Sequence, residues 1–496
     1  MKKLTVWALL ATLVVAGSLF AAGPNAARGI ATEASFITGS PATTNNDDSC
    51  DISVAPAATL LLPYFEVSED PLGETTLFTI TNVSQYPAIA HVVLWTDYSY
   101  PVIDFNIYLT GFDVQSINLF DLIWREPQGL IAPASGPKEL GTGTVTSTGT
   151  GTGDFDEIEP GSGMLLGACA TLTGAIPEFY QTRMQTAFTE GIVAGVPGDD
   201  NFPECENVGG EHENAVGYAT IDVVNLCTTS LPTDGDDYFA TEIRFDNVLI
   251  GDYQQVNSAQ DFAQGNPMVH IRAVPELNGN IGVNPTNFDR TFYSRYQTGG
   301  DVVDRRQPLP STFAARWING GTGEFQTSYK IWREGVNDGT DCETVEENGT
   351  LVIAETVVFD EHENGEGNAP EAGDISPVIG PGVATLPETS LTAIEPGSDV
   401  FPQAILSDNT AGWTYLNLHN PADPDQGFAT QNWVVVSMRA EGRYSVDFDA
   451  AWLGNGCSPI ATVTSYSNPA LPAPGTATVP TPAGAILPGP AADVTP

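Results

Sequence analysis

Short runs of alternating apolar and polar residues, separated by many glycines and prolines, are the feature that most constrains the fold of this 496-residue chain. Ile103, Phe105, Ile107 and Leu109 alternate with polar neighbours, which is the period of a strand with one buried face. The 50 Gly and 37 Pro residues fall between runs of this kind. The pattern predicts an all-β fold of two to three β-sandwich-like units with long loops.

One segment has the spacing of a short helix. Pro177 suits its first turn, Met184, Ala187 and Phe188 can share one face, and Gly191 ends it. Together with the linker compositions, this divides the chain into a signal peptide (1–23), a linker (24–49), a β-sandwich-like unit (50–135), a Gly/Thr-rich linker (136–162), a second β unit with the short helix (163–300), a C-terminal β unit with an acidic Gly/Pro-rich loop (301–467) and a Pro/Ala-rich disordered tail (468–496).

The sequence also contains a weak internal repeat. At a constant offset of 140 residues, Asp97-Tyr98 recurs as Asp237-Tyr238, and six further positions up to Gln115 and Gln255 are identical. We interpret this match as a divergent β-unit repeated along the chain. The alternative is that strands ending in Leu-x-Gly resemble each other by composition.

The first 23 residues have the pattern of a cleaved secretory signal. Lys2 and Lys3 precede an apolar stretch, residues 4–20, which ends in small residues. The alternative is a retained membrane anchor, for which the stretch is barely long enough. No later segment approaches 18 uninterrupted apolar residues, so we expect a secreted protein (extracellular, at the cell surface or periplasmic) with no membrane span in the mature chain.

An even number of cysteines in an exported chain favours disulfides. The six are Cys50, Cys169, Cys205, Cys227, Cys342 and Cys457. They allow 15 connectivities, of which we favour Cys205–Cys227, Cys342–Cys457 and, by elimination, Cys50–Cys169.

The chain is strongly acidic, with 62 Asp and Glu against 17 Lys and Arg and a net charge of −45. Removal of a signal that contains two Lys and no acid would make it −47. We therefore expect no nucleic acid partner, because the surface as a whole lacks the clustered Lys and Arg that phosphate contacts need.

A tetrapeptide that occurs twice in the sequence provides two candidate metal sites. Glu211-His212-Glu213-Asn214 recurs as Glu361-His362-Glu363-Asn364, and imidazole beside carboxylates can bind a divalent ion. Consecutive residues of an extended chain point to opposite faces, however, so solvated acidic loops are the alternative. Acidic turns elsewhere make structural calcium a second candidate on composition, although no segment has the full spacing of a calcium-binding loop.

A basic, aromatic-rich segment stands out against this acidity. Residues 290–333 hold seven of the 17 basic residues and have a net charge of +4. Arg beside aromatic rings suits stacking on sugars or capture of anions, which makes a ligand or partner site one interpretation. The other is that the segment docks against acidic neighbours inside the fold. The candidate binding residues are Arg305, Arg306, Arg316, Trp317, Trp332 and Arg333.

Several stretches taken together are similar to known sequences. Residues 92–119, 244–257, 269–276, 307–318 and 439–457 resemble a group of uncharacterised exported bacterial proteins with no assigned activity. The resemblance implies export and a single co-evolved architecture, and it brings no catalytic residues to transfer.

No signature of a nucleophile elbow, zinc helix or phosphate-binding loop occurs in the chain. We therefore expect a non-catalytic structural or adhesive/binding protein of the cell surface or extracellular space, with a glycan or another surface protein as partner. The alternative is an extracellular glycan-active enzyme that uses paired carboxylates, with the Arg/Trp-rich segment as its sugar platform.

Overall fold

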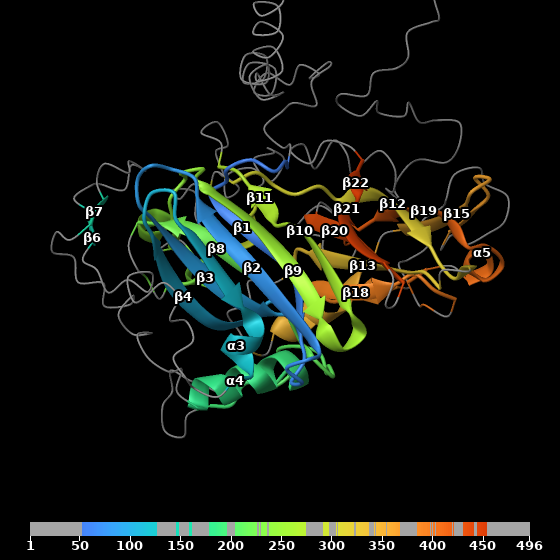
Figure 1. The fold of residues 1–496 in the computed structure, drawn as a ribbon, viewed down its shortest axis with the longest axis horizontal. Coiled ribbons are helices and arrows are strands. Elements are labelled where there is room, and N and C mark those ends of the chain that lie inside the picture. Colours follow the sequence, from blue (N-terminus) through green and yellow to red (C-terminus); the bar gives the residue numbers. More distant parts are fainter. Residues whose placement is uncertain are drawn as a thin grey trace, which may run out of the picture.

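The computed structural model of the protein describes residues 52–125, 178–273, 291–367, 384–418 and 430–453, with gaps inside these ranges, and the short backbone segments 145–147 and 158–160. The fold is all-β, as the alternating pattern predicts, and its two β-sandwiches lie side by side in Figure 1. Every strand pair among the described residues is antiparallel, and several pairs join distant parts of the chain, such as Thr59–Val67 with Ala215–Val224.

The first sandwich packs a five-stranded sheet, in the order β11-β1-β8-β3-β4, against a four-stranded sheet in the order β10-β9-β2-β5. Its strands are β1 (Thr59–Val67), β2 (Glu74–Asn82), β3 (Ala88–Thr96), β4 (Pro101–Leu109), β5 (Val114–Asn118), β8 (Ala215–Val224), β9 (Leu249–Asn257), β10 (Phe262–Pro267) and β11 (Val269–Ile271). Alternate residues of the facing strands, such as Leu60, Leu62, Phe78 and Ile80, form the core between the sheets.

The second sandwich packs the five-stranded sheet β16-β15-β19-β12-β22 against the four-stranded sheet β18-β13-β20-β21. Its strands are β12 (Thr312–Ile318), β13 (Gln326–Arg333), β15 (Glu355–Asp360), β16 (Gly365–Gly367), β18 (Thr389–Ala393), β19 (Ala411–Asn417), β20 (Asn432–Ala440), β21 (Tyr444–Asp449) and β22 (Ala451–Trp452). Phe313, Trp317, Ile331, Leu416 and Val434 belong to its core.

The two sandwiches have the same topology. Taken in chain order, β1, β2, β3, β4, β5, β8, β9, β10 and β11 correspond to β12, β13, β15, β16, β18, β19, β20, β21 and β22, and both sheets then have identical strand orders. The strand registers agree as well. Thr59 lies opposite Asp222 in the first sandwich, and Thr312 lies opposite Asn417 at the corresponding place in the second.

A glycine beside an aromatic pair marks the same position in each sandwich. A Cβ at Gly217 would collide with the carbonyl oxygen of Trp95, and a Cβ at Gly412 would collide with that of Phe359. Tyr218, which follows Gly217, stacks on Trp95 of the neighbouring strand. Trp413, which follows Gly412, stacks on Phe359 in the same way, and the interplanar angle is 8° in both pairs. Close backbone approach therefore requires glycine at both places.

The repeat predicted at an offset of 140 residues does not coincide with this duplication. Residues 103–109 lie in β4, whereas residues 243–249 form an isolated bridge, a connecting segment and only the first residue of β9. The number of residues between corresponding positions is not constant, because loops of different length separate the strands. Gly412 is therefore at a different offset from Gly217 than Thr312 is from Thr59. A search at constant offset cannot detect a duplication of this kind.

The segments 50–135 and 163–300, which the sequence divides into two β units, contribute strands to the same sheets. β8, from the second segment, lies between β1 and β3, from the first. The predicted helix is confirmed as α4 (Glu178–Glu190), with Met184, Ala187 and Phe188 buried and Gly191 at a φ of 63° after its end. Two shorter helices, α3 (Leu119–Ile123) and α5 (Gln403–Asp408), have no counterpart in the sequence analysis.

Smaller elements complete the described chain. They are the paired β6 (Val145–Ser147) and β7 (Ile158–Pro160) within the predicted linker 136–162, the paired β14 (Leu351–Val352) and β17 (Thr385–Leu386), and the helical turns η3 (Pro232–Asp234), η4 (Tyr238–Glu242), η5 (Ser258–Gln260), η6 (Ser294–Tyr296) and η8 (Val345–Thr350). The signal peptide 1–23, the linker 24–49 and the tail 468–496 lie outside the described residues.

A third apolar core joins the sandwiches. Leu61, Val93 and Trp95, on the outer face of the first five-stranded sheet, pack with Trp332 and Trp433, on the outer face of the second four-stranded sheet. The connecting segment between β11 and β12 adds buried aromatic side chains to this core, namely Phe292, Tyr293 and Tyr296. Burial of this many aromatic rings fixes the two sandwiches against each other.

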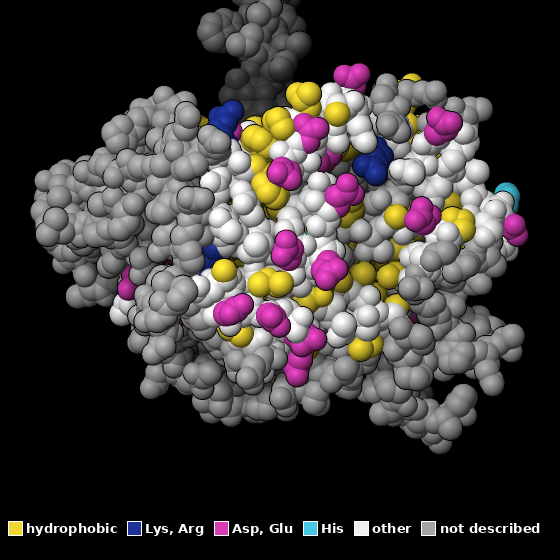
Figure 2. Space-filling model, turned by 90° about the horizontal axis from the view of Figure 1, so that it is seen from below, with side chains coloured by type: hydrophobic (Ala, Val, Ile, Leu, Met, Phe, Trp, Pro, Cys, Tyr) yellow, Lys and Arg dark blue, Asp and Glu magenta, His cyan; other side chains and the backbone are white. Residues whose placement is uncertain are grey.

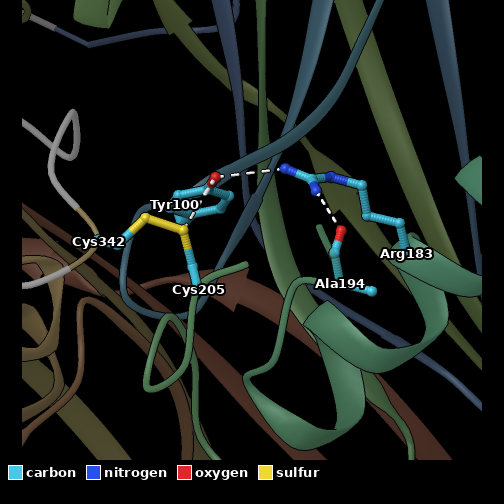
Figure 3. The surroundings of a disulfide bond; sticks show 5 residues. All are labelled: Tyr100, Arg183, Ala194, Cys205 and Cys342. Carbon is cyan, nitrogen blue, oxygen red and sulfur yellow. Dashed lines mark hydrogen bonds between the residues drawn. A yellow bond between two sulfur atoms is a disulfide. The ribbon is translucent and has the colours of Figure 1, made fainter. Parts of the chain in front are cut away.

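A disulfide also crosses between the sandwiches. Cys205, in the loop before β8, is bonded to Cys342, in the segment after β13, with the two Cα atoms 5.5 Å apart. In Figure 3 the hydroxyl of Tyr100 lies beside this bond, 3.6 Å from the sulfur of Cys205, and accepts a hydrogen bond from Arg183. The expected pairs Cys205–Cys227 and Cys342–Cys457 are therefore wrong, because tertiary packing brings together two cysteines that are 137 residues apart.

Loss of this crosslink should weaken the whole body. We expect Cys205→Ser, Cys342→Ser and the double variant each to lower the free energy of unfolding by a similar amount, about 3–5 kcal/mol for a loop of this length. Denaturant unfolding measures the effect, and mass spectrometry of unreduced peptides identifies the pair. Recovery of a Cys205–Cys227 peptide would contradict the assignment.

Candidate functional site

The candidate binding residues of the basic segment are mostly internal. Arg306, Trp317, Trp332 and Arg333 are all at most 2% exposed, Arg316 is exposed on β12, and Arg305 lies outside the described residues. Trp317 and Trp332 belong to two different cores. The structure thus buries four of these six side chains, and Arg306 among them lies against acidic neighbours, as the internal-docking interpretation expects.

Arg306 is the centre of a buried ion network. Its guanidinium lies 3.1 Å from Asp304 and 3.5 Å from Asp222, donates to the carbonyl of Arg244 and hydrogen-bonds Thr59. Tyr238 and Tyr293 both donate to the second oxygen of Asp222, each at 2.8 Å. Although burial alone lowers the pKa of Arg306, the two carboxylates raise it, so the guanidinium stays charged.

Arg333 is buried, and among the described residues its guanidinium forms no ion pair with a carboxylate within 4 Å. It donates to the carbonyl oxygens of Leu351, Val352 and Leu418 at 2.6–2.8 Å. Leu351 and Val352 belong to β14 and Leu418 follows β19, so this side chain ties β13 to both segments. Burial lowers the pKa of Arg333 to about 9.

Sequence reasoning missed the ion pair between Arg295 and Glu388. The two side chains are 5% and 0% exposed, and their closest atoms are 2.7 Å apart. Arg295 also donates to Ser99 at 2.8 Å, so the connecting segment links the first sandwich to the start of β18 in the second. The local sequence gives no signal for this pair, because its members are 93 residues apart.

The burial of these basic side chains makes the surface of the protein more acidic. Several of the few cations are buried as internal partners, whereas most acidic side chains of the turns are exposed. On the face shown in Figure 2, Asp and Glu side chains clearly outnumber those of Lys and Arg.

The two acidic tetrapeptides lie in different sandwiches. His212 contacts Asp97 at 2.9 Å, and the same carboxylate accepts from the backbone of Gly210 at 3.0 Å. His362 lies in the exposed turn after β15. The flanking glutamates Glu211, Glu213, Glu361 and Glu363 are exposed. Within the described ranges no group of three or more His, Cys, Asp or Glu side chains is placed to hold a metal ion, and structural calcium stays a prediction.

The His212–Asp97 pair should make stability depend on pH. Burial lowers the pKa of His212, but the hydrogen bond and charge of Asp97, together with the charge of Glu66, raise it overall. The contribution of the pair is therefore complete below the unfolded pKa of about 6.5 and is lost as pH rises through the folded pKa. We expect His212→Ala to cost on the order of 1 kcal/mol at pH 5.5 and less at pH 8.5.

Thermal unfolding at the two pH values measures this difference. His362→Ala is the matched control, since that side chain is exposed and its loss should change stability by less than about 0.5 kcal/mol at either pH. An equal effect of His212→Ala at both pH values would contradict the pairing.

A polar pocket opens where the two sandwiches meet. This interface pocket has a volume of about 250 Å³ and receives side chains from β1, β2, β9 and β10 of the first sandwich and from β13, β18 and β20 of the second. Its lining residues are Glu66, Ser68, Gly73, Glu74, Asn214, Gln255, Asn257, Gln260, Phe262, Gln264, Ser328, Leu391, Ser437 and Arg439.

Two carboxylates lie in its wall. Glu66 accepts from Asn214 at 2.6 Å and from Tyr64 at 2.9 Å, which fixes its orientation. Burial, reinforced by the charge of Glu66, raises the pKa of Glu74 to about 7. Glu74 is therefore partly protonated near neutral pH and can donate a hydrogen bond as well as accept one.

A chain of uncharged side chains that spans both sandwiches also lines the pocket. Gln264 donates to Gln255 at 3.2 Å and to Ser437 at 2.8 Å. Nearby, Lys330 is fully buried beside Asp447 and lies 5.5 Å from the ring centre of Tyr253. This ion pair crosses from β13 to β21 within one sheet.

No known family model, curated protein or solved structure matches this chain. None of the helices within the described ranges is long and apolar enough to cross a membrane. The interface pocket was not found by sequence reasoning. Its residues come from seven strands and three connecting segments, and only the repeated Gln and Asn of residues 254–264 offered a local signal.

Proposed function

We propose that this is an exported, disulfide-stabilised, non-catalytic binding or structural protein of the cell surface or extracellular space. The observation that carries the proposal is the joining of two equivalent sandwiches into one body by the Cys205–Cys342 bond, an aromatic core and buried ion pairs. A body locked in this way suits a load-bearing or ligand-presenting role. The basic start and apolar stretch of residues 1–23, and the resemblance to exported bacterial proteins, support the compartment.

Export can be tested with the full chain in a bacterial host. We expect the mature protein outside the cytoplasm, with its N-terminus close to residue 24 and with Cys205 and Cys342 oxidised, because disulfides persist in oxidising compartments. Fractionation and intact-mass measurement check both points. A cytoplasmic protein that retains residues 1–23 would contradict the proposal, and Lys2→Glu with Lys3→Glu, which removes the basic start, should abolish export.

A glycan-active enzyme is the second candidate, and one observation favours it. Glu66 and Glu74 lie in the wall of the same pocket, and the raised pKa of Glu74 suits a general acid while Glu66 is held as a hydrogen-bond acceptor. Glycoside hydrolysis uses two carboxyl groups, one of which acts as a general acid.

This candidate predicts hydrolysis of a glycan by the purified protein. Glu74→Gln and Glu66→Gln should each reduce the rate by at least about 100-fold, as expected for loss of an acid or a base. Glu69→Gln, at an exposed position in the neighbouring turn, is the matched control and should leave the rate unchanged. Reducing-end assays on a panel of polysaccharides make the measurement, and the same activity in all three variants would remove the pocket from consideration as an active site.

A further inference from the structure

We propose that the interface pocket is a binding site for a small neutral saccharide, contacted by side chains of both sandwiches. The inference rests on the proposed binding role and gives that role a ligand class. Ser328 is the one lining residue from the basic, aromatic-rich segment, whose described tryptophans are buried in the cores.

The chemistry of the lining is that of a polyhydroxylated ligand. Most of the polar groups are amides and hydroxyls, which can both donate and accept hydrogen bonds, as sugar hydroxyls do. They are Asn214, Gln255, Asn257, Gln260 and Gln264 among the amides and Ser68, Ser328 and Ser437 among the hydroxyls. A few placed polar groups in a concave site fix the orientation of a ligand.

Gln255 gives independent support. The side chain is 3% exposed, and its Oε1 accepts from Gln264, but its Nε2 is buried with no acceptor among the described residues. A buried donor without a partner is costly, and native proteins rarely keep one without a reason. Because Gln255 lines the pocket together with Gln264 and Ser437, a ligand hydroxyl bound there is the acceptor that we assign to this amide.

Size and charge narrow the ligand further. A volume of about 250 Å³ is below the roughly 300–1,000 Å³ of drug-sized sites, which limits the occupant to about one or two sugar rings. The carboxylates Glu66 and Glu74 outnumber Arg439, so they disfavour an anionic sugar. Phe262 and Leu391 supply apolar surface for the C–H face of a ring.

The test is saturation-transfer NMR, followed by calorimetry, of the full exported protein with neutral mono- and disaccharides. Gln255→Leu should weaken binding about tenfold or more, because it removes one buried donor. Gln254→Leu is the matched control, since it changes the exposed neighbour on the same strand, and it should bind as the wild type does. Ser328→Leu narrows the pocket without removing a member of the Gln255–Gln264–Ser437 chain and should weaken binding as well.

The outcomes separate this inference from the proposed function. Wild-type protein that binds no saccharide in the panel overturns the inference, as does binding that is unchanged in both Gln255→Leu and Ser328→Leu. Calcium binding alone, without any saccharide, also overturns it, because the carboxylates would then be the ligands. Hydrolysis of the bound sugar supports the site and replaces the non-catalytic role, whereas a failure of export removes the proposed compartment and leaves the binding result unaffected.

Discussion

The arrangement of this protein depends on cations buried at and beside the junction of two β-sandwiches. Arg295 neutralises Glu388 across that junction, Arg306 holds Asp222 and Asp304, and Lys330 is paired with Asp447. Each of these ions has lost its hydration, so each is stable only while its partners stay in place. The ion pairs therefore fix where the strands and the connecting segment must lie, and the aromatic core fills the space between them.

The same interactions account for the electrostatic character of the molecule. A chain with 17 basic and 62 acidic residues that buries several of its cations has an even more acidic surface than its composition implies. Net charge of this size favours solubility and repels anionic partners. The interface pocket departs from this surface, because amides and hydroxyls dominate its lining and its charges are few.

The two sandwiches share a topology but use different sheet faces where they meet. The outer face of the first five-stranded sheet meets the outer face of the second four-stranded sheet in the third core, and β10 of the first sandwich also hydrogen-bonds β20 and β21 of the second. The Trp95–Tyr218 stack is therefore buried, while its counterpart Phe359–Trp413 stays half-buried. Equivalent positions of the two sandwiches are therefore used differently, one in the core between the sandwiches and the other at the surface.

The sequence by itself determined the class of fold, because period-2 alternation and glycine and proline between short runs depend on local backbone geometry. It also predicted the helix at residues 178–190 and singled out the unusual cations at 290–333. Only the tertiary structure decided that Arg306, Lys330 and Arg333 of that segment are internal, that Cys205 joins Cys342, and that Glu66, Gln255 and Ser437 surround one pocket. These contacts join residues far apart in the chain, and their partners are set by how whole sheets pack, which no local pattern encodes.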